Sequence, residues 1–278
     1  MEEIEALHIL SHMPKGRQLL SAHKSATEAL LDPLAASWEK LNSWKEDLAL
    51  VKSHGITLIA HNDPRYPKAL REASDFPLIL YVKGELLPLD HSSIAIIGTE
   101  ECSLFAKDTT RKIAQELAEK GVTITSTLER GINTAAHLGA LLSGRTVSIL
   151  NSGFAQINSS DTLALTSHIT HKGAVVSEFP MNMAQKQIPI NRRSRLLHFF
   201  SEVLLVTETS TKSPSLKLAS SFEKPCFAFS GLANAEFLAI KKAILVQNVQ
   251  EILSFLYSNN LKSWKDLHPS SSFSLKQD

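Results

Sequence analysis

The sequence has 278 residues, of which 43% are hydrophobic and 21% charged, a balance that excludes a wholly disordered chain and fits about two globular domains. The chain has 29 basic and 28 acidic residues, so its net charge is only +1. It lacks the overall positive charge that is typical of many nucleic-acid-binding proteins, and any site for a polyanion must come from a local cluster of basic residues. Apolar runs such as residues 76–82 are far shorter than the about 20 residues that cross a bilayer. The acidic start at Glu2 and Glu3 is unlike a secretory signal, so we expect a cytoplasmic protein with no membrane contact.

Residues 1–54 are predicted to form a small all-α domain of helix-hairpin or SAM-like type. Apolar residues recur there at spacings of three and four: Ile4, Leu7, Ile9, Leu10, Leu19, Leu20, Leu30, Leu31 and Leu34. A turn at residues 13–17 contains proline, glycine and two cations. It either presents backbone N–H groups to a phosphate or is a solvated turn between two packed helices.

Residues 55–253 are predicted to form a second, larger domain of α/β class. Residues 56–59 are expected to form a strand and residues 63–67 a rigid corner. Six short β-rich runs then alternate with amphipathic helical patterns: 94–97, 122–125, 146–150, 174–177, 203–206 and 226–229. Uniformly apolar strands with intervening helices indicate a doubly wound, mostly parallel sheet, and its ligands should bind beyond the carboxyl ends of the strands. The remaining residues, 254–278, are expected to form a short polar tail.

Small residues follow the first two strands of this alternating series. Gly98 and Thr99 precede a helix predicted to begin near Ser103, where free N–H groups and the helix dipole favour an anion. The second strand ends at Ser126 and is followed by a loop at Gly131. Residues 151–153 form a third glycine-containing turn, so the three turns predict one polar rim. His137, inside the second helix, is interpreted as a packed or capping histidine and not as a catalytic base, because no carboxylate lies four residues before or after it.

A basic cluster follows the fourth strand. No acidic residue separates Glu178 from Glu202, whereas Arg192, Arg193 and Arg195 crowd the start of an apolar stretch. Guanidinium groups this close favour a bound phosphate, and the alternative is a solvated basic face paired with Glu178 or Glu202.

No catalytic or metal-binding motif accompanies this cluster. The hydroxyl-rich loop at 208–215 resembles a phosphate-binding turn in composition but lacks the GxxxxGK[ST] pattern, and neither HExxH nor GxSxG occurs. The two cysteines, Cys102 and Cys226, form no CxxC motif. We therefore expect no catalytic residue, no metal site and no cofactor.

Several segments together resemble the DprA/Smf family, the DNA-processing proteins of natural transformation. In order and spacing the matching segments are YPKAL at 66–70, DFPLILYVKG at 75–84, GINTAAH at 131–137 with GAL at 139–141, SEFP at 177–180 and RSR at 193–195. The resemblance covers about residues 55–253, and the N-terminal helical domain matches in position and type. The C-terminal winged-helix domain of many members is expected to be missing here.

The resemblance implies an extended Rossmann-like domain that binds single-stranded DNA, forms a homodimer and helps to load a RecA-type recombinase during competence and recombination. It implies no enzymatic activity. The implied phosphate-binding residues are Gly98, Thr99, Ser103, Ser126, Gly131, Arg193, Arg195, Lys212 and Ser213.

The chain departs from the family pattern within this implied site. Glu100 stands where the family has arginine, and Glu129 where it has alanine. Thr127, Asn133, Ser194, Pro214 and Ser230 replace glycine, aspartate, asparagine, glycine and proline respectively. A carboxylate about 6 Å from a phosphate costs roughly 3 kcal/mol at an effective dielectric constant of about 20, so we expect a weakened or reshaped pocket unless Glu100 pairs with Arg111 or Arg130. One alternative is a nucleotide-processing enzyme similar to the phosphoribohydrolases, although this chain lacks their PGGxGTxxE stretch. The other is an interaction protein whose DNA site has decayed.

Overall fold

Short helices form the N-terminal part of the chain, as the spacing of its apolar residues predicts. A computed structural model describes residues 2–13, 15–35, 43–189, 192–193, 195–210, 213–232 and 243–258. The helices are α1 (Glu3–Ser11), α2 (Gly16–Ala22), α3 (Ala26–Ala29), the 3₁₀ turn η1 (Pro33–Ala35) and α4 (Ser43–Ser53). Helix α1 buries Ala6, Leu7, Ile9 and Leu10 and packs against α2 and α3. Its hydrophobic face therefore forms the centre of this helical group.

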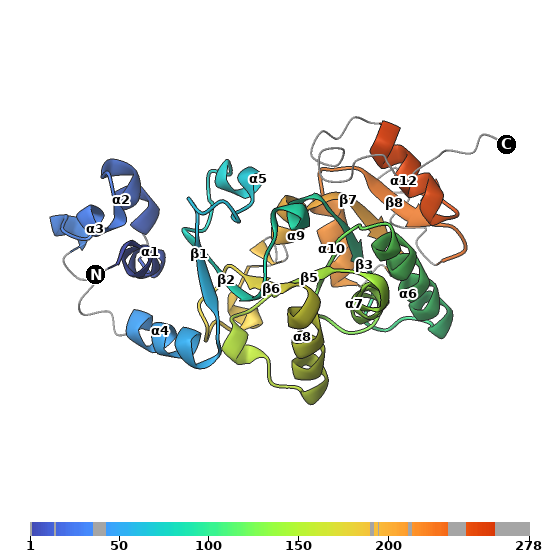
Figure 1. Cartoon of the computed structure of the whole chain (residues 1–278), viewed down its shortest axis with the longest axis horizontal. Coiled ribbons are helices and arrows are strands. Elements are labelled where there is room, and N and C mark those ends of the chain that lie inside the picture. The colour runs from blue at the N-terminus through green and yellow to red at the C-terminus, as the bar shows by residue number, and fades with distance from the viewer. Residues whose placement is uncertain are drawn as a thin grey trace. The chain divides into compact units, whose positions relative to one another are not determined.

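The chain divides into two units, which are described separately. Unit 1 comprises Met1–Pro88 and Ile149–Arg193, and unit 2 comprises Leu89–Ser148 and Ser194–Asp278. The helical group therefore shares unit 1 with strands, although the sequence suggests a division near residue 54. Figure 1 labels the elements along the chain.

Unit 1 contains the antiparallel strands of the fold. After α4 come β1 (Thr57–Ala60), α5 (Lys68–Arg71) and β2 (Ile79–Gly84); the second stretch adds η4 (Phe154–Gln156), α8 (Ser160–Lys172), β6 (Ala174–Ser177) and η5 (Gln185–Gln187). Strand β2 pairs antiparallel with both β1 and β6. Its first four residues, 79–82, are buried, because each face of a central strand is covered.

Unit 2 contains the parallel strands that were predicted from the alternating pattern. Its elements are η3 (Pro88–Ser92), β3 (Ser93–Ile97), α6 (Leu104–Glu119), β4 (Ile124–Thr127), α7 (Ile132–Ser143), β5 (Thr146–Ile149), α9 (Arg195–Phe200), β7 (Ser201–Val206), α10 (Pro214–Ser221), β8 (Cys226–Phe229), β9 (Ile244–Val246) and α12 (Val249–Ser258). Strand β3 pairs parallel with β4 and β7, and β7, β8 and β9 continue in parallel. Helix α12 extends into the range predicted as a tail, and residues 259–278 lie outside the described residues.

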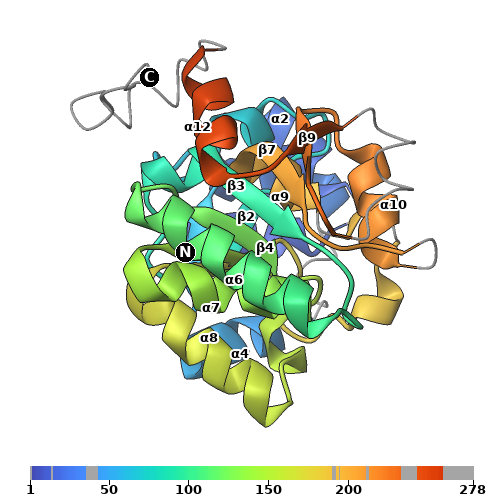
Figure 2. The same ribbon diagram turned by 90° about the vertical axis from the view of Figure 1, so that its right-hand side faces the viewer.

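The hydrophobic core of unit 2 lies between its strands and three helices. Figure 2 shows α6 and α7 together in front of β3 and β4. Helix α6 contributes Ile113 and Leu117 to this core, and α12 contributes Ile252 and Leu256. Every residue of β3 and β4 is buried, so both faces of these strands are covered.

The nine strands belong to one mixed, mostly parallel sheet in the order β1-β2-β6-β5-β4-β3-β7-β8-β9. This confirms the predicted α/β fold class. No described helix is both long and apolar enough to cross a membrane.

Candidate functional site

The carboxyl ends of β3 and β7 form one level edge in unit 2. The two strands are parallel neighbours, and Ile97 pairs with Val206 at their ends. The helix that follows each strand begins with a serine N-cap. Ser103 Oγ accepts a hydrogen bond from the Ala106 N–H (3.1 Å) at α6, and Ser213 Oγ accepts one from the Ser215 N–H (3.3 Å) at α10. Two helix N-termini therefore follow neighbouring strand ends, the arrangement in which α/β proteins hold anions.

The turn after β3 uses its first two backbone donors internally. The Gly98 N–H donates to Asn133 Oδ1 (3.1 Å), and the Thr99 N–H donates to the Glu208 carbonyl oxygen (2.9 Å). A Cβ atom on Gly98 would lie 2.6 Å from Ile132 Cγ1. Glycine at this position therefore allows a close approach between segments, and its N–H group already has a partner.

A carboxylate of the protein itself occupies the start of α6. Glu208 Oε2 accepts hydrogen bonds from the Ser103 N–H (2.9 Å) and from Ser103 Oγ (3.3 Å). A negative charge here interacts favourably with the N-terminal end of the helix dipole. Glu208 thus binds in the manner predicted for a phosphate, a role that the sequence alone did not indicate.

The loop before α7 is shaped by Gly131 and carries a second internal carboxylate. Gly131 has φ +72°, and a Cβ atom there would lie 2.4 Å from the Thr99 carbonyl oxygen. Glu129 Oε2 accepts hydrogen bonds from Thr127 Oγ1 (3.2 Å) and Asn133 Nδ2 (3.3 Å). Thr127, Glu129 and Asn133, which differ from the family pattern, therefore form a local hydrogen-bond network.

Two further residues of this region lie in the interior. Ser126 is fully buried and its hydroxyl donates to the Ile96 carbonyl oxygen (2.6 Å), so the hydroxyl is engaged within the sheet. His137 is also fully buried, with Nδ1 2.7 Å from Thr146 Oγ1. Burial lowers the pKa of His137 to about 4, so the ring is neutral at pH 7. These contacts agree with its interpretation as a packed histidine.

The basic cluster divides between the two units. In unit 1, Arg192 pairs with the buried Glu178 carboxylate (3.0 Å), so the alternative of an acidic partner is correct for this arginine. Arg193 is half-buried, and its Nε donates to the Ile188 carbonyl oxygen (3.0 Å). In unit 2, Arg195 is the half-buried first residue of α9. Lys212 and Ser194 lie outside the described residues.

Glu100 is exposed at the turn after β3. Within the described part of the chain it forms no ion pair with Arg111 or Arg130, the two partners suggested by the sequence. Its charge is therefore uncompensated by those two arginines.

Comparison with known proteins identifies the family. Residues 57–257 match the model of the family described as DNA recombination-mediator protein A. The chain belongs to this family. The resemblance stated from the sequence motifs is thereby confirmed.

Relatives of known sequence and structure extend this result. Protein Smf of Escherichia coli strain K12 is 33% identical over 210 residues, which cover 72% of this chain and 56% of that protein. The chain spans about half the length of the curated relatives it matches. The structure of DprA from Streptococcus pneumoniae superposes with a TM-score of 0.67 at 23% sequence identity. The match covers 91% of this chain and 93% of that one, so the two proteins share a fold. A second solved structure is that of DNA processing protein A from Helicobacter pylori, reported for its single-stranded DNA binding mode. It is 25% identical with a TM-score of 0.61, and the match covers 73% of this chain and 96% of that one.

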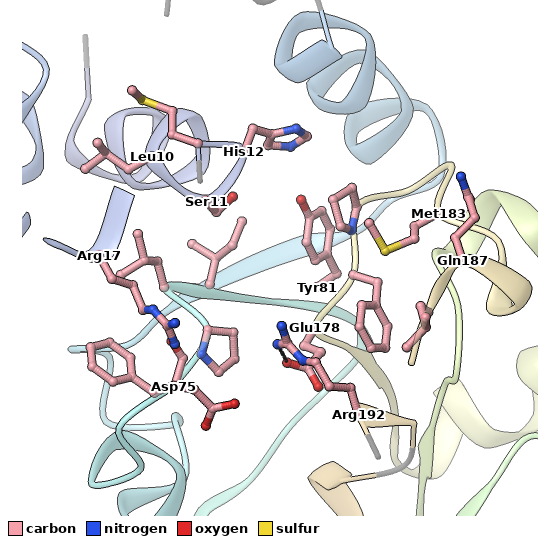
Figure 3. A pocket seen from close by; sticks show the side chains of 18 of the residues that line it. Leu10, Ser11, His12, Arg17, Asp75, Tyr81, Glu178, Met183, Gln187 and Arg192 are labelled. Carbon is pink, nitrogen blue, oxygen red and sulfur yellow. Dashed lines mark hydrogen bonds and ion pairs between the residues drawn. The ribbon is translucent and has the colours of Figure 1, made fainter. Parts of the chain in front are cut away.

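This member of the DNA recombination-mediator protein A family also has a cavity within unit 1. It has a volume of about 480 Å³ and lies among α1, α2 and the segments around residues 75–81 and 178–192. Figure 3 shows Arg17 and Asp75 on one side and the Glu178–Arg192 pair on another. Arg17, which the sequence places in a basic turn, is the second residue of α2, and it donates to the Phe76 carbonyl oxygen (3.2 Å). Arg17 thus links α2 to the segment before β2.

Proposed function

We propose that this protein binds single-stranded DNA through the sugar–phosphate backbone, at the carboxyl edge of the parallel strands in unit 2, without catalysing a reaction. The single observation that carries the proposal is the level edge of β3 and β7, each followed by a serine-capped helix. The single-stranded DNA binding mode described for the H. pylori relative supports the same ligand. Because phosphates carry no base identity, binding should depend little on sequence.

The proposed contacts fall into two groups. Gly98, Thr99, Ser126 and Gly131 shape the rim and bring its segments together. The proposed contacts with phosphate in unit 2 are Ser103, Ser213, Arg195 and Lys212, and Arg193 of unit 1 is proposed separately as a phosphate contact. In this proposal arginine forks and helix N-termini hold successive phosphates. We further propose that the protein forms a homodimer and transfers the bound strand to a RecA-type recombinase; the description of its family as a recombination mediator supports the second step.

The proposal is tested by titrating labelled oligothymidylate into the full chain at two salt concentrations. We expect affinity to fall as salt rises, with a log–log slope near −0.7 for each phosphate neutralised. Arg193→Ala and Arg195→Ala should each weaken binding several-fold and make the slope shallower. Lys112→Ala is the matched control, because Lys112 is exposed on α6 about 13 Å along the helix from Ser103. Absence of binding in dilute buffer would refute the proposal.

A second candidate function is protein–protein interaction without DNA binding, and the acidic residues of the rim favour it. Glu100 is exposed there, and Glu208 already occupies the start of α6. Glu100→Arg places the family's cation at this turn. If the DNA proposal holds, this substitution strengthens a measurable wild-type affinity; if wild type does not bind and the variant does, the site has decayed.

A further inference from the structure

A cluster of histidines and one aspartate lies in unit 1, and neither the DNA proposal nor the sequence motifs use it. His8 and His12 are four residues apart at the end of α1, so their side chains lie on the same side of the helix. Asp47 comes from α4. Asp47 Oδ2 lies 2.8 Å from His8 Nε2 and 3.5 Å from His12 Nε2. One ligand atom from each of the three residues therefore falls within 4.8 Å of the other two.

The Asp47 carboxylate is held in a fixed orientation by two further donors. Tyr81 Oη donates to Oδ2 (2.8 Å), and the Met181 N–H donates to Oδ1 (2.5 Å). The carboxylate is therefore an oriented ligand in the interior, with the supporting hydrogen bonds that metal-binding carboxylates have.

Two nitrogens of the cluster, His8 Nδ1 and His12 Nε2, lack a hydrogen-bond partner, and His12 Nε2 is the one that faces the carboxylate. The His12 side chain is only 7% exposed, and its Nε2 forms no hydrogen bond although it lies 3.5 Å from Asp47 Oδ2. A buried polar atom without a partner is costly. A cation between this nitrogen and the carboxylate would satisfy both atoms.

We propose that His8 Nε2, His12 Nε2 and Asp47 Oδ2 bind one divalent transition-metal ion, of which Zn²⁺ is the most suitable. Two imidazoles and one carboxylate suit Zn²⁺, Co²⁺ or Ni²⁺, whereas Mg²⁺ and Ca²⁺ prefer oxygen ligands. Tetrahedral bonds of about 2.1 Å place ligand atoms about 3.4 Å apart, so the Asp47–His12 separation fits and the Asp47–His8 contact opens by about half an ångström. His12 and Tyr81 also line the 480 Å³ cavity, shown in Figure 3, from which water can complete the coordination.

The bound ion has a structural consequence for unit 1. It would join α1 to α4, and through Tyr81 and Met181 it would connect both helices to β2 and to the segment after β6. An ion that binds only the folded chain stabilises it by mass action. The proposal is independent of DNA binding, because no residue of the cluster belongs to the strand-end rim.

The test uses the untagged full chain after treatment with EDTA and removal of the chelator. Added Co²⁺ should give the visible absorption bands of tetrahedral cobalt at one ion per chain, and Zn²⁺ should displace it. Zn²⁺ should raise the melting temperature by several degrees, whereas Mg²⁺ at the same concentration should not. Absence of the cobalt bands, or of a one-to-one stoichiometry, would show that the cluster is only a hydrogen-bond network.

Two variants separate metal binding from folding. His12→Ala should abolish the cobalt bands, and a cooperative melting transition of the metal-free variant shows that the chain still folds although the buried ring is lost. His54→Ala is the control, since His54 is an exposed histidine of the same unit, and it should bind Co²⁺ as wild type does. Cobalt binding that persists in His12→Ala overturns the proposal. Oligonucleotide titration of the metal-free chain tests the DNA proposal separately.

Discussion

His137 couples the stability of unit 2 to pH. Its pKa is lowered from 6.5 to about 4 by burial, which the hydrogen bond with the Thr127 carbonyl only partly opposes. The unfolded chain therefore binds an additional proton between pH 6.5 and 4, and stability falls as the pH falls through this window. At pH 4 the loss from this residue is about 3 kcal/mol.

The substitution His137→Gln should remove this component. We expect the free energy of unfolding of the variant, measured with urea, to fall less than that of wild type between neutral pH and about pH 4.5. His168→Gln is the control because His168 is exposed on α8, and its pH dependence should match wild type. Equal losses in wild type and His137→Gln would contradict the assignment.

Gly131 is a second residue whose cost of replacement follows from geometry. Its φ of +72° and the Glu100 carbonyl oxygen, 2.3 Å from the position of a Cβ atom, both oppose a side chain. Gly131→Ala should therefore lower the free energy of unfolding by about 3 kcal/mol. Gly55→Ala, at φ +62° with nothing within 4 Å, should cost only about 1 kcal/mol. Similar losses from the two substitutions, measured by urea unfolding, would show that the close approach is relieved by a small shift.

Local turns of the candidate site could be predicted from the sequence, whereas the contacts between distant segments could not. The motif around Gly131 and the turn at Gly98 were identified from local spacing. Glu208 was not, because its contact with Ser103 depends on the pairing of β3 with β7, which are far apart in the chain. Asp47 was missed for the same reason, although the four-residue spacing of His8 and His12 was visible in the sequence.

At the scale of the element, the start of α6 decides how strongly an anion binds. Glu208 now accepts from Ser103 there, so an incoming phosphate meets a negative charge. Glu208→Gln removes the charge but keeps an oxygen acceptor for the helix. We expect single-stranded oligonucleotide affinity at about 0.1 M salt to rise about five- to tenfold, since a carboxylate about 6 Å from a phosphate costs up to roughly 3 kcal/mol.

A matched substitution controls for net charge in that experiment. Glu116 is exposed in the middle of α6, and Glu116→Gln changes the charge of the chain by the same amount. Its affinity should stay within about twofold of wild type, because exposed charges beyond a Debye length of about 10 Å are screened. An equal gain in both variants would indicate a general charge effect, and no gain in Glu208→Gln would place the DNA away from α6.

The strands show which elements can be predicted without knowing their neighbours. Strands β6 (Ala174–Ser177) and β8 (Cys226–Phe229) begin and end where their apolar runs predict. Strand β4 begins at Ile124, two residues later than expected, because pairing with β3 starts there. Strand β2 was identified only as an apolar run, since its antiparallel partners come from distant parts of the chain. Strand β9 was missed because Ile244 and Leu245 are exposed and its run is short.

At the scale of the whole chain, the N-terminal helices are part of a larger unit. Helix α1 packs against β1 and β2, and Asp47 of α4 accepts from Tyr81 and from the Met181 N–H. The family match, in contrast, begins at residue 57, and the sequence suggests an independent domain over residues 55–253. If unit 1 folds as a whole, a chain without the N-terminal helices should be destabilised. If residues 55–253 form an independent domain, that chain should keep its stability.

Removal of residues 1–56 decides between them. If unit 1 is the cooperative unit, the shortened chain exposes Ile59 and Tyr81, each only 1% exposed now, and leaves the Tyr81 hydroxyl and the Met181 N–H without their acceptor. We expect a melting temperature lower by at least several degrees and binding of a dye specific for exposed apolar surface, because lost burial and lost hydrogen bonds both favour unfolding. Tyr81→Phe in the full chain is the control: it removes one hydrogen bond, should cost about 1 kcal/mol and should bind no dye. A shortened chain that melts like the full chain without binding dye would establish residues 57–278 as an independent folding unit.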